Sequence, residues 1–201
     1  MRKLLSFFSL MIFGFALLAQ QTKTPAGSST QAMYDAQAQS VQKKFDHIVE
    51  NGSKEKPDQT PIIIKENELN TWLQSGDAAL PKGVDKLQLS AEPGIINGTA
   101  TVDFDTITAG SSSNNPLLAL FRGTHEVKAK ANAQAAGGKA LVQIQSVSID
   151  GIGVPRMALE YFADKYIKPK HPELGLDSSF DLPYQIDTAE VGSHQVTLTQ
   201  K

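Results

Sequence analysis

The sequence contains no cysteine among its 201 residues. This absence excludes disulfide bonds, zinc sites with thiolate ligands and thiol nucleophiles together. It also excludes a bacterial lipoprotein, because no cysteine follows the apolar N-terminal run to carry the lipid. The fold must therefore rest on a hydrophobic core, for which this length and a hydrophobic content of 40% are sufficient.

An excess of positive charge is absent as well. The formal net charge is -2 and the isoelectric point is near 6.1, with the lysines and arginines dispersed along the chain. Nucleic-acid-binding proteins usually carry a clustered basic surface. We therefore expect no nucleic-acid partner.

Motifs of known catalytic chemistry are also lacking. The histidines lie in four different kinds of segment, at His47, His125, His171 and His194. None adjoins a G-x-S-x-G nucleophile elbow, and there is no H-E-x-x-H pair, phosphate-binding loop or dinucleotide fingerprint. Asp103 and Asp105 share one strand face, where they either bind a hard cation or are simply solvated. We predict a protein that is not an enzyme and has no cofactor.

The N-terminus has the pattern of an export signal. A basic start, Met1-Arg2-Lys3, precedes an apolar run from Leu4 to Ala19. This run is slightly short of the roughly 20 residues that a spanning helix needs. We expect cleavage near Ala19 and a periplasmic or secreted mature protein. The alternative is an uncleaved N-terminal membrane anchor.

Composition divides the remaining chain into two parts. Residues 20–60 contain a polar tether, a helical pattern over Thr30–Glu50 and a charged linker bounded by proline. The apolar stripe of this helix is thin, so the helix either lies on the main domain or projects from it. Residues 61–201 form the expected globular domain.

A central hairpin is the clearest structural pattern. Alternating apolar residues predict a strand from Thr124, and Gly137-Gly138 supplies the positive φ angles of a tight turn. On the return strand the alternation changes phase near Gln145-Ser146, which predicts a β-bulge. The inward-facing residues of the return strand are then Ala140, Val142, Ile144, Val147 and Ile149.

A helix follows from Pro155 to about Ile167. Its apolar residues cover more than one face, so it should be surrounded, and a curved sheet could surround it. Further hairpins are predicted over 84–104 and 180–198. We therefore expect an α+β fold, in which a curved antiparallel sheet of successive hairpins wraps around an amphipathic helix and an N-terminal helix precedes the sheet.

The first and last of these hairpins share a pattern. Leu80-Pro81 is followed by apolar residues at the same offsets as those after Leu182-Pro183, and each strand then turns at a glycine. We interpret this echo as a recurring supersecondary unit.

A sheet curved around a helix encloses an apolar interior, which either is filled by side chains or admits an acyl chain. Leu69, Trp72 and Leu73 share one face of a short helix, and Trp72 is either a core anchor or a cavity wall. The segment 116–121 is short and apolar, and the loop 110–115 before it could gate entry. The candidate ligand-binding residues are Leu69, Trp72, Leu73, Leu117, Leu120, Phe121 and Phe162.

Several short motifs resemble those of known envelope proteins. Glu-Asn-Glu-Leu-Asn-x-Trp-Leu at 66–73 and Leu-Pro-x-Gly-Val at 80–84 resemble tubular lipid-binding (TULIP-like) bacterial periplasmic proteins, among them the mycobacterial phospholipid-binding proteins of lipoglycan maturation. The helix at 155–162 and the segment 175–183 look like those of uncharacterised acidobacterial secreted proteins. The resemblance covers about 61–201 and implies a sheet curled around a helix with lipid binding. It supplies no catalytic residue.

These observations favour an exported, non-enzymatic envelope protein that binds a lipid or another apolar ligand. The alternative is an envelope scaffold or protein-interaction module without a small ligand. In either case the expected partners are a membrane surface or another envelope protein.

The export signal gives a first testable prediction. N-terminal sequencing of the exported protein should find a chain that begins close to Gln20, because signal peptidase acts after a small residue at the end of the apolar run. A membrane fraction that retains Met1–Ala19 would instead identify the segment as an anchor.

Overall fold

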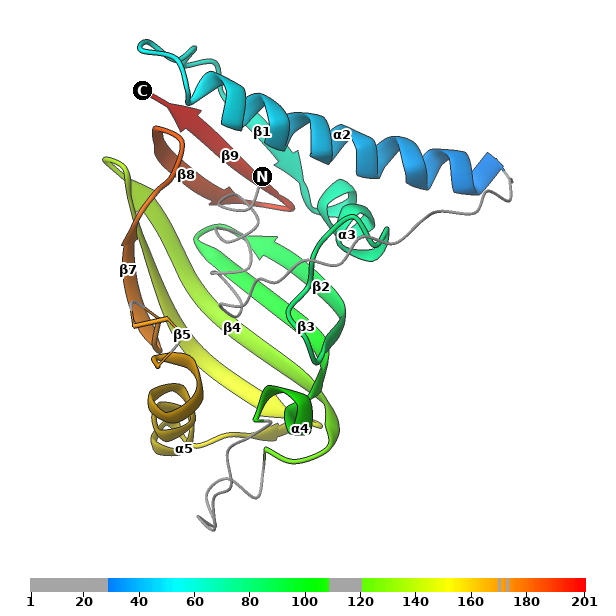
Figure 1. Ribbon diagram of the computed structural model, residues 1–201, viewed down its shortest axis with the longest axis vertical. Helices are drawn as coiled ribbons and strands as arrows, with labels where there is room; N and C mark the ends of the chain where they lie inside the picture. The colour runs from blue at the N-terminus through cyan, green and yellow to red at the C-terminus, as the bar shows by residue number, and fades with distance from the viewer. Residues whose placement is uncertain (1–28, 109–120, 170, 173) are drawn as a thin grey trace.

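The computed structural model describes residues 29–108, 121–169, 171–172 and 174–201 (Figure 1). The expected signal segment, the loop 110–115 and two candidate ligand residues, Leu117 and Leu120, lie outside these residues. Among the helices described, none is both long and apolar enough to cross a membrane.

The centre of the fold is an open, curved, antiparallel sheet (Figure 1). Six strands follow the order β1-β9-β8-β4-β3-β2, and β5 extends the sheet from β4 and also pairs with β6 and β7. The strands are β1 (Ile62–Lys65), β2 (Val84–Glu92), β3 (Ile95–Asp103), β4 (Thr124–Ala136), β5 (Lys139–Ile149), β6 (Ile152–Gly153), β7 (Asp177–Asp181), β8 (Ile186–Gly192) and β9 (Gln195–Gln200).

In the described part of the chain, five helical segments accompany the sheet. They are α2 (Ser29–Asn51), α3 (Glu66–Gln74), α4 (Phe104–Ile107), α5 (Arg156–Phe162) and the π-helix η2 (Ala163–Ile167). A mostly antiparallel sheet accompanied by a few helices is compatible with the predicted α+β class.

The β4–β5 hairpin has the predicted turn and the predicted bulge. Gly137 and Gly138 adopt φ angles of 62° and 77°, and they connect the paired residues Ala136 and Lys139. Further along, Lys130 pairs with Ser146 whereas Ala131 pairs with Ile144, so Gln145 is the extra residue of a β-bulge.

The helix expected from Pro155 to Ile167 exists, but its second half is wider than an α-helix. It starts after Pro155 as α5 and continues without a break into η2. There the Lys168 amide donates to the carbonyl of Ala163, five residues back, over 2.9 Å. Such π-turns are rare and frequently occur at functional sites.

The N-terminal helix α2 belongs to the main hydrophobic core. We expected the globular domain to begin after residue 60, with this helix on its surface or projecting from it. Val41, Phe45 and Ile48 on its apolar face are fully or nearly fully buried in the same core cluster as Phe162 and Leu198, so the helix lies on the domain and does not project from it. Only the N-terminal end of α2 extends past the sheet and α3 (Figure 1).

A buried polar cluster fastens the end of α2 to the last strand. The Asn51 side-chain amide donates to the Gln200 side-chain oxygen over 2.9 Å and to the Asp58 carbonyl over 2.8 Å. The Gln200 amide in turn donates to the carbonyls of Ile48 and Tyr184. Gly52 is required beside this cluster, because a Cβ there would lie 2.2 Å from the Tyr184 carbonyl oxygen.

The polar cluster yields a prediction about stability. Gln200→Leu should lower the free energy of unfolding by about 1–3 kcal/mol, because the Tyr184 carbonyl loses its buried donor. Gln195→Leu on the same strand is the matched control, since its side chain is only partly buried. Chemical denaturation measures both, and equal midpoints for the two variants would show that the cluster contributes little.

Candidate apolar ligand pocket

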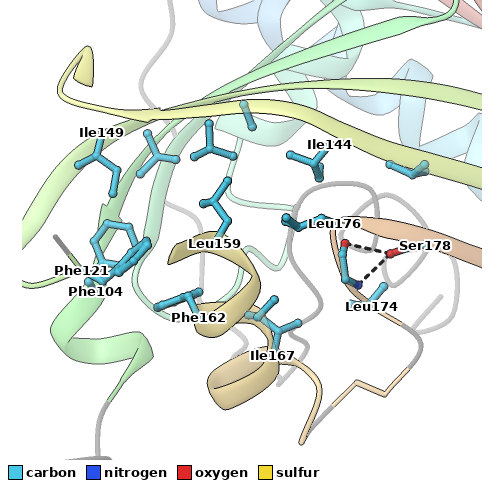
Figure 2. A pocket seen from close by; sticks show the side chains of 16 residues that line it. Phe104, Phe121, Ile144, Ile149, Leu159, Phe162, Ile167, Leu174, Leu176 and Ser178 are labelled. Atoms are coloured by element: carbon cyan, nitrogen blue, oxygen red, sulfur yellow. Dashed lines mark hydrogen bonds between the residues drawn. The ribbon is translucent and has the colours of Figure 1, made fainter. Parts of the chain in front are cut away.

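A pocket of about 110 Å³ lies between the sheet and the α5–η2 segment (Figure 2). Strands β4 and β5 form its roof, α5 and η2 form its floor, and the segment before β7 closes one end. It is lined by Phe104, Phe121, Val127, Ala129, Val142, Ile144, Val147, Ile149, Leu159, Phe162, Ala163, Ile167, Leu174, Gly175, Leu176 and Ser178.

The bulge at Gln145 makes the roof of the pocket apolar. Val142 and Ile144 line the pocket before the bulge, and Val147 and Ile149 line it afterwards. Strict alternation from Ile144 would have turned Ser146 and Ser148 toward the pocket instead. One extra residue therefore keeps both halves of β5 apolar on the same face.

Three phenylalanines close the end of the pocket opposite β7. The rings of Phe121 and Phe162 stack with centroids 4.5 Å apart. Phe104 meets both of them edge-on, at 5.3 Å from Phe121 and 5.9 Å from Phe162. These edge-to-face arrangements are favourable for aromatic side chains. The cluster joins three separate segments of the chain into one wall, which we call the aromatic wall.

The pocket offers no ionisable group to a ligand. Its one polar side chain, Ser178, already accepts from the Gly175 amide over 2.9 Å and donates to the Gly175 carbonyl over 3.1 Å (Figure 2). A buried polar ligand group would find no free partner among these lining residues and would lose its hydration. The pocket is therefore suited to an apolar molecule or to the apolar end of an amphiphile.

The structure brings Phe121 and Phe162 together, but it places the short helix elsewhere. Leu69, Trp72 and Leu73 are buried on α3, which packs against α2. The Trp72 ring meets Phe45 edge-on at 5.0 Å, and its indole N–H donates to Gln42 over 3.2 Å. None of the three residues is among those that line the pocket, and this environment matches the core-anchor interpretation of Trp72.

Most of the pocket residues were not among the sequence-based candidates. The alternation in β4 and β5 identified which side chains face inward, and this signal could have named the roof. The residues of the floor and the far end, Leu159, Ile167, Leu174 and Leu176, depend on how the α5–η2 segment lies across the sheet. No local pattern in the sequence encodes that placement.

Asp103 and Asp105 do not share a strand face as predicted, because Asp103 ends β3 and Asp105 lies in α4. Asp103 caps α4 by accepting from the amides of Asp105 and Thr106, and from the Thr106 hydroxyl over 2.7 Å. These hydrogen bonds lower the pKa of Asp103. Within the described part of the chain, no group of three or more His, Asp or Glu side chains is arranged to hold a metal ion.

One histidine borders the aromatic wall. His125 lies on β4 with its ring 6.3 Å from that of Phe104. Its Nδ1 is 2.6 Å from an Asp150 carboxylate oxygen, and its Nε2 is 2.5 Å from the Arg122 carbonyl. The hydrogen bond to Asp150, and then that to Arg122, raise the pKa of His125.

The aromatic wall gives a second stability prediction. Phe162→Ala should cost about 3–5 kcal/mol, because it empties a buried site that touches both Phe104 and Phe121. Tyr161→Ala, one residue earlier and exposed, is the control and should cost far less. A small effect of Phe162→Ala in denaturation experiments would mean that the pocket collapses freely around the missing ring.

The chain was compared with protein-family models, with curated proteins and with solved structures, and none of the three comparisons finds a match.

Proposed function

We propose that this is an exported envelope protein that binds a lipid or another apolar ligand and catalyses no reaction. The observation that carries the proposal is the predominantly apolar pocket between the sheet and the α5–η2 segment. Apolar pockets with few polar groups are the usual form of small-molecule sites. The N-terminal export pattern is consistent with a ligand drawn from the envelope.

The proposed architecture is a sheet that wraps around the α5–η2 segment without filling the space between them. Leu159, Phe162 and Ile167 point from this segment toward the sheet (Figure 2). The segment is held by its buried side chains and by polar interactions. One is the ion pair of 2.7 Å between Arg156 on α5 and Asp177 on β7. Because this ion pair is exposed, breaking it would add little to the cost of a shift that enlarges the pocket.

The size of the pocket limits what it holds. Its volume of about 110 Å³ is below the roughly 150 Å³ of an apolar cavity known to bind benzene. It therefore fits the end of an acyl chain rather than a whole lipid. Each buried CH₂ contributes about 0.8 kcal/mol, so about five carbons supply about 4 kcal/mol. That corresponds to a roughly millimolar dissociation constant. The affinity would increase if the α5–η2 segment moved to cover more of the acyl chain.

The alternative function is an envelope scaffold or interaction module without a small ligand. The outer side of the same helix favours it, because Met157 is 66% exposed and Tyr161 is 37% exposed. Ile152, on the neighbouring strand β6, is 69% exposed. Exposed apolar side chains of this kind are available to a membrane surface or to another protein.

The proposal predicts that filling the pocket weakens the binding of an apolar ligand. Ala129→Ile adds apolar volume to the roof of the pocket, on a strand whose conformation favours β-branched residues. We expect 1-octanol, a neutral chain, to shift the NMR signals of the Ile144, Ile149 and Leu159 side chains in the natural protein. The Ala129→Ile substitution should weaken this binding at least about tenfold, which corresponds to ~1.4 kcal/mol of binding free energy.

Asn132→Ile is the matched control, because it places the same side chain on the exposed face of β4. It should leave octanol binding unchanged. Native mass spectrometry of the protein purified from a bacterial envelope would then show whether a lipid is retained. If a saturating concentration of 1-octanol shifts none of the NMR signals of the pocket side chains, and no lipid copurifies, the scaffold function would be favoured.

A further inference from the structure

We propose that His125 is a protonation-dependent latch, which in its doubly protonated form holds the aromatic wall of the pocket closed. The consequence for ligand binding rests on the function proposed above, whereas the latch itself concerns the protein without a ligand. The geometry of three contacts carries the inference.

The first contact is between the His125 ring and two oxygen atoms. Nδ1 faces the Asp150 carboxylate at 2.6 Å and Nε2 faces the Arg122 carbonyl at 2.5 Å. A carbonyl oxygen and an ionised carboxylate are acceptors only. Both ring nitrogens must therefore carry a proton if both contacts are to be hydrogen bonds. A neutral ring satisfies one oxygen and turns a lone pair toward the other.

The second and third contacts connect the ring to the pocket. Arg122 directly follows Phe121, which stacks on Phe162 at 4.5 Å. The next residue, Gly123, accepts the amide proton of Phe104 over 2.9 Å. Residues 121–123 thus lie between α4 and β4, and the Nε2 contact is a side-chain link between His125 on β4 and this segment. Losing that link frees the carbonyl beside Phe121 and loosens the aromatic wall.

The charges around the ring favour the imidazolium. Asp150, in the turn after β5, is the nearest charge, and it is held in place by the Glu126 amide at 2.9 Å. Asp105 on α4 is a second carboxylate whose charge favours the protonated ring. The Glu126 carboxylate is paired with Lys128 at 2.9 Å, and Arg122 contributes the adjacent cation on the turn. Carboxylates from α4 and from the turn after β5 therefore stabilise the protonated His125 ring.

The sign of the pH dependence follows from these contacts. The hydrogen bonds raise the pKa of His125 above its ordinary value of 6.5. The latch is therefore fully closed below about pH 6.5 and is released as the pH rises through the higher pKa of the folded protein. By linkage, a ligand that prefers the closed wall raises this pKa further, by one unit for each tenfold gain in affinity.

NMR titration of the full chain without ligand tests the latch directly. The ring signals of Phe121 and Phe162 should change with the same midpoint as the His125 ring. Asp150→Asn removes the charge and leaves one side-chain oxygen for the two donors, His125 Nδ1–H and the Glu126 amide, so both midpoints should fall together. His194→Gln is the control, because His194 pairs with Glu66 at 2.9 Å and is not among the pocket residues. The proposal would be overturned if the ring signals of Phe121 and Phe162 did not change as His125 titrates.

The effect on binding is measured with 1-octanol, which carries no charge at any pH. Its affinity should fall several-fold as His125 loses its proton, and the midpoint of this fall should move down in Asp150→Asn. Constant affinity across the titration would overturn the effect of the latch on binding but leave the proposed function intact. Absence of octanol binding at every pH contradicts the proposed function, and the phenylalanine signals then still decide the latch.

Discussion

The pocket depends on a single irregularity in the hydrogen bonding between β4 and β5. Because Gln145 is inserted without a partner, the apolar alternation of β5 changes phase and both halves of the strand face the α5–η2 segment. Bulges also bend the strand that carries them. The same residue therefore sets the polarity of the roof and contributes to the curvature beneath which the helical segment lies. Without it, the far half of the roof would present serines to the aromatic wall.

The sheet is also organised by a repeated unit, which the echo in the sequence indicated. The Pro81 carbonyl accepts from the Val84 amide at 3.0 Å, and the Pro183 carbonyl accepts from the Ile186 amide at 3.2 Å. Each turn leads into a hairpin, and the tips of these two hairpins bond reciprocally. The Gly94 amide donates to Val191 and the His194 amide donates to Ala91, each over 2.8 Å. Two similar hairpins thus meet tip to tip, which leaves β4 and β5 as the long strands that form the pocket.

Local signals predicted much of this fold because they act over a few residues. Period-two alternation, the Gly137-Gly138 turn and the phase change near Gln145 each leave a mark in the sequence. Pairings between distant segments leave none. Ile62 pairs with Leu198, and the partner of Trp72 comes from α2, which looked too poor in apolar residues to enter the core. The sequence left open whether the apolar interior is filled by side chains, and only Phe121 and Phe162 of the described pocket lining were among the candidates.

The same helix connects the two functions considered for this protein. The inner side of α5 lines the pocket with Leu159 and Phe162, while its outer side exposes Met157 and Tyr161. The outer side also carries the exposed ion pair between Arg156 and Glu160, so it is mixed in polarity. The sheet covers the inner side, and the exposed Met157 and Tyr161 would be available to a membrane surface or a partner. Contact with the outer side would act directly on the floor of the pocket, so the binding and interaction functions need not be exclusive.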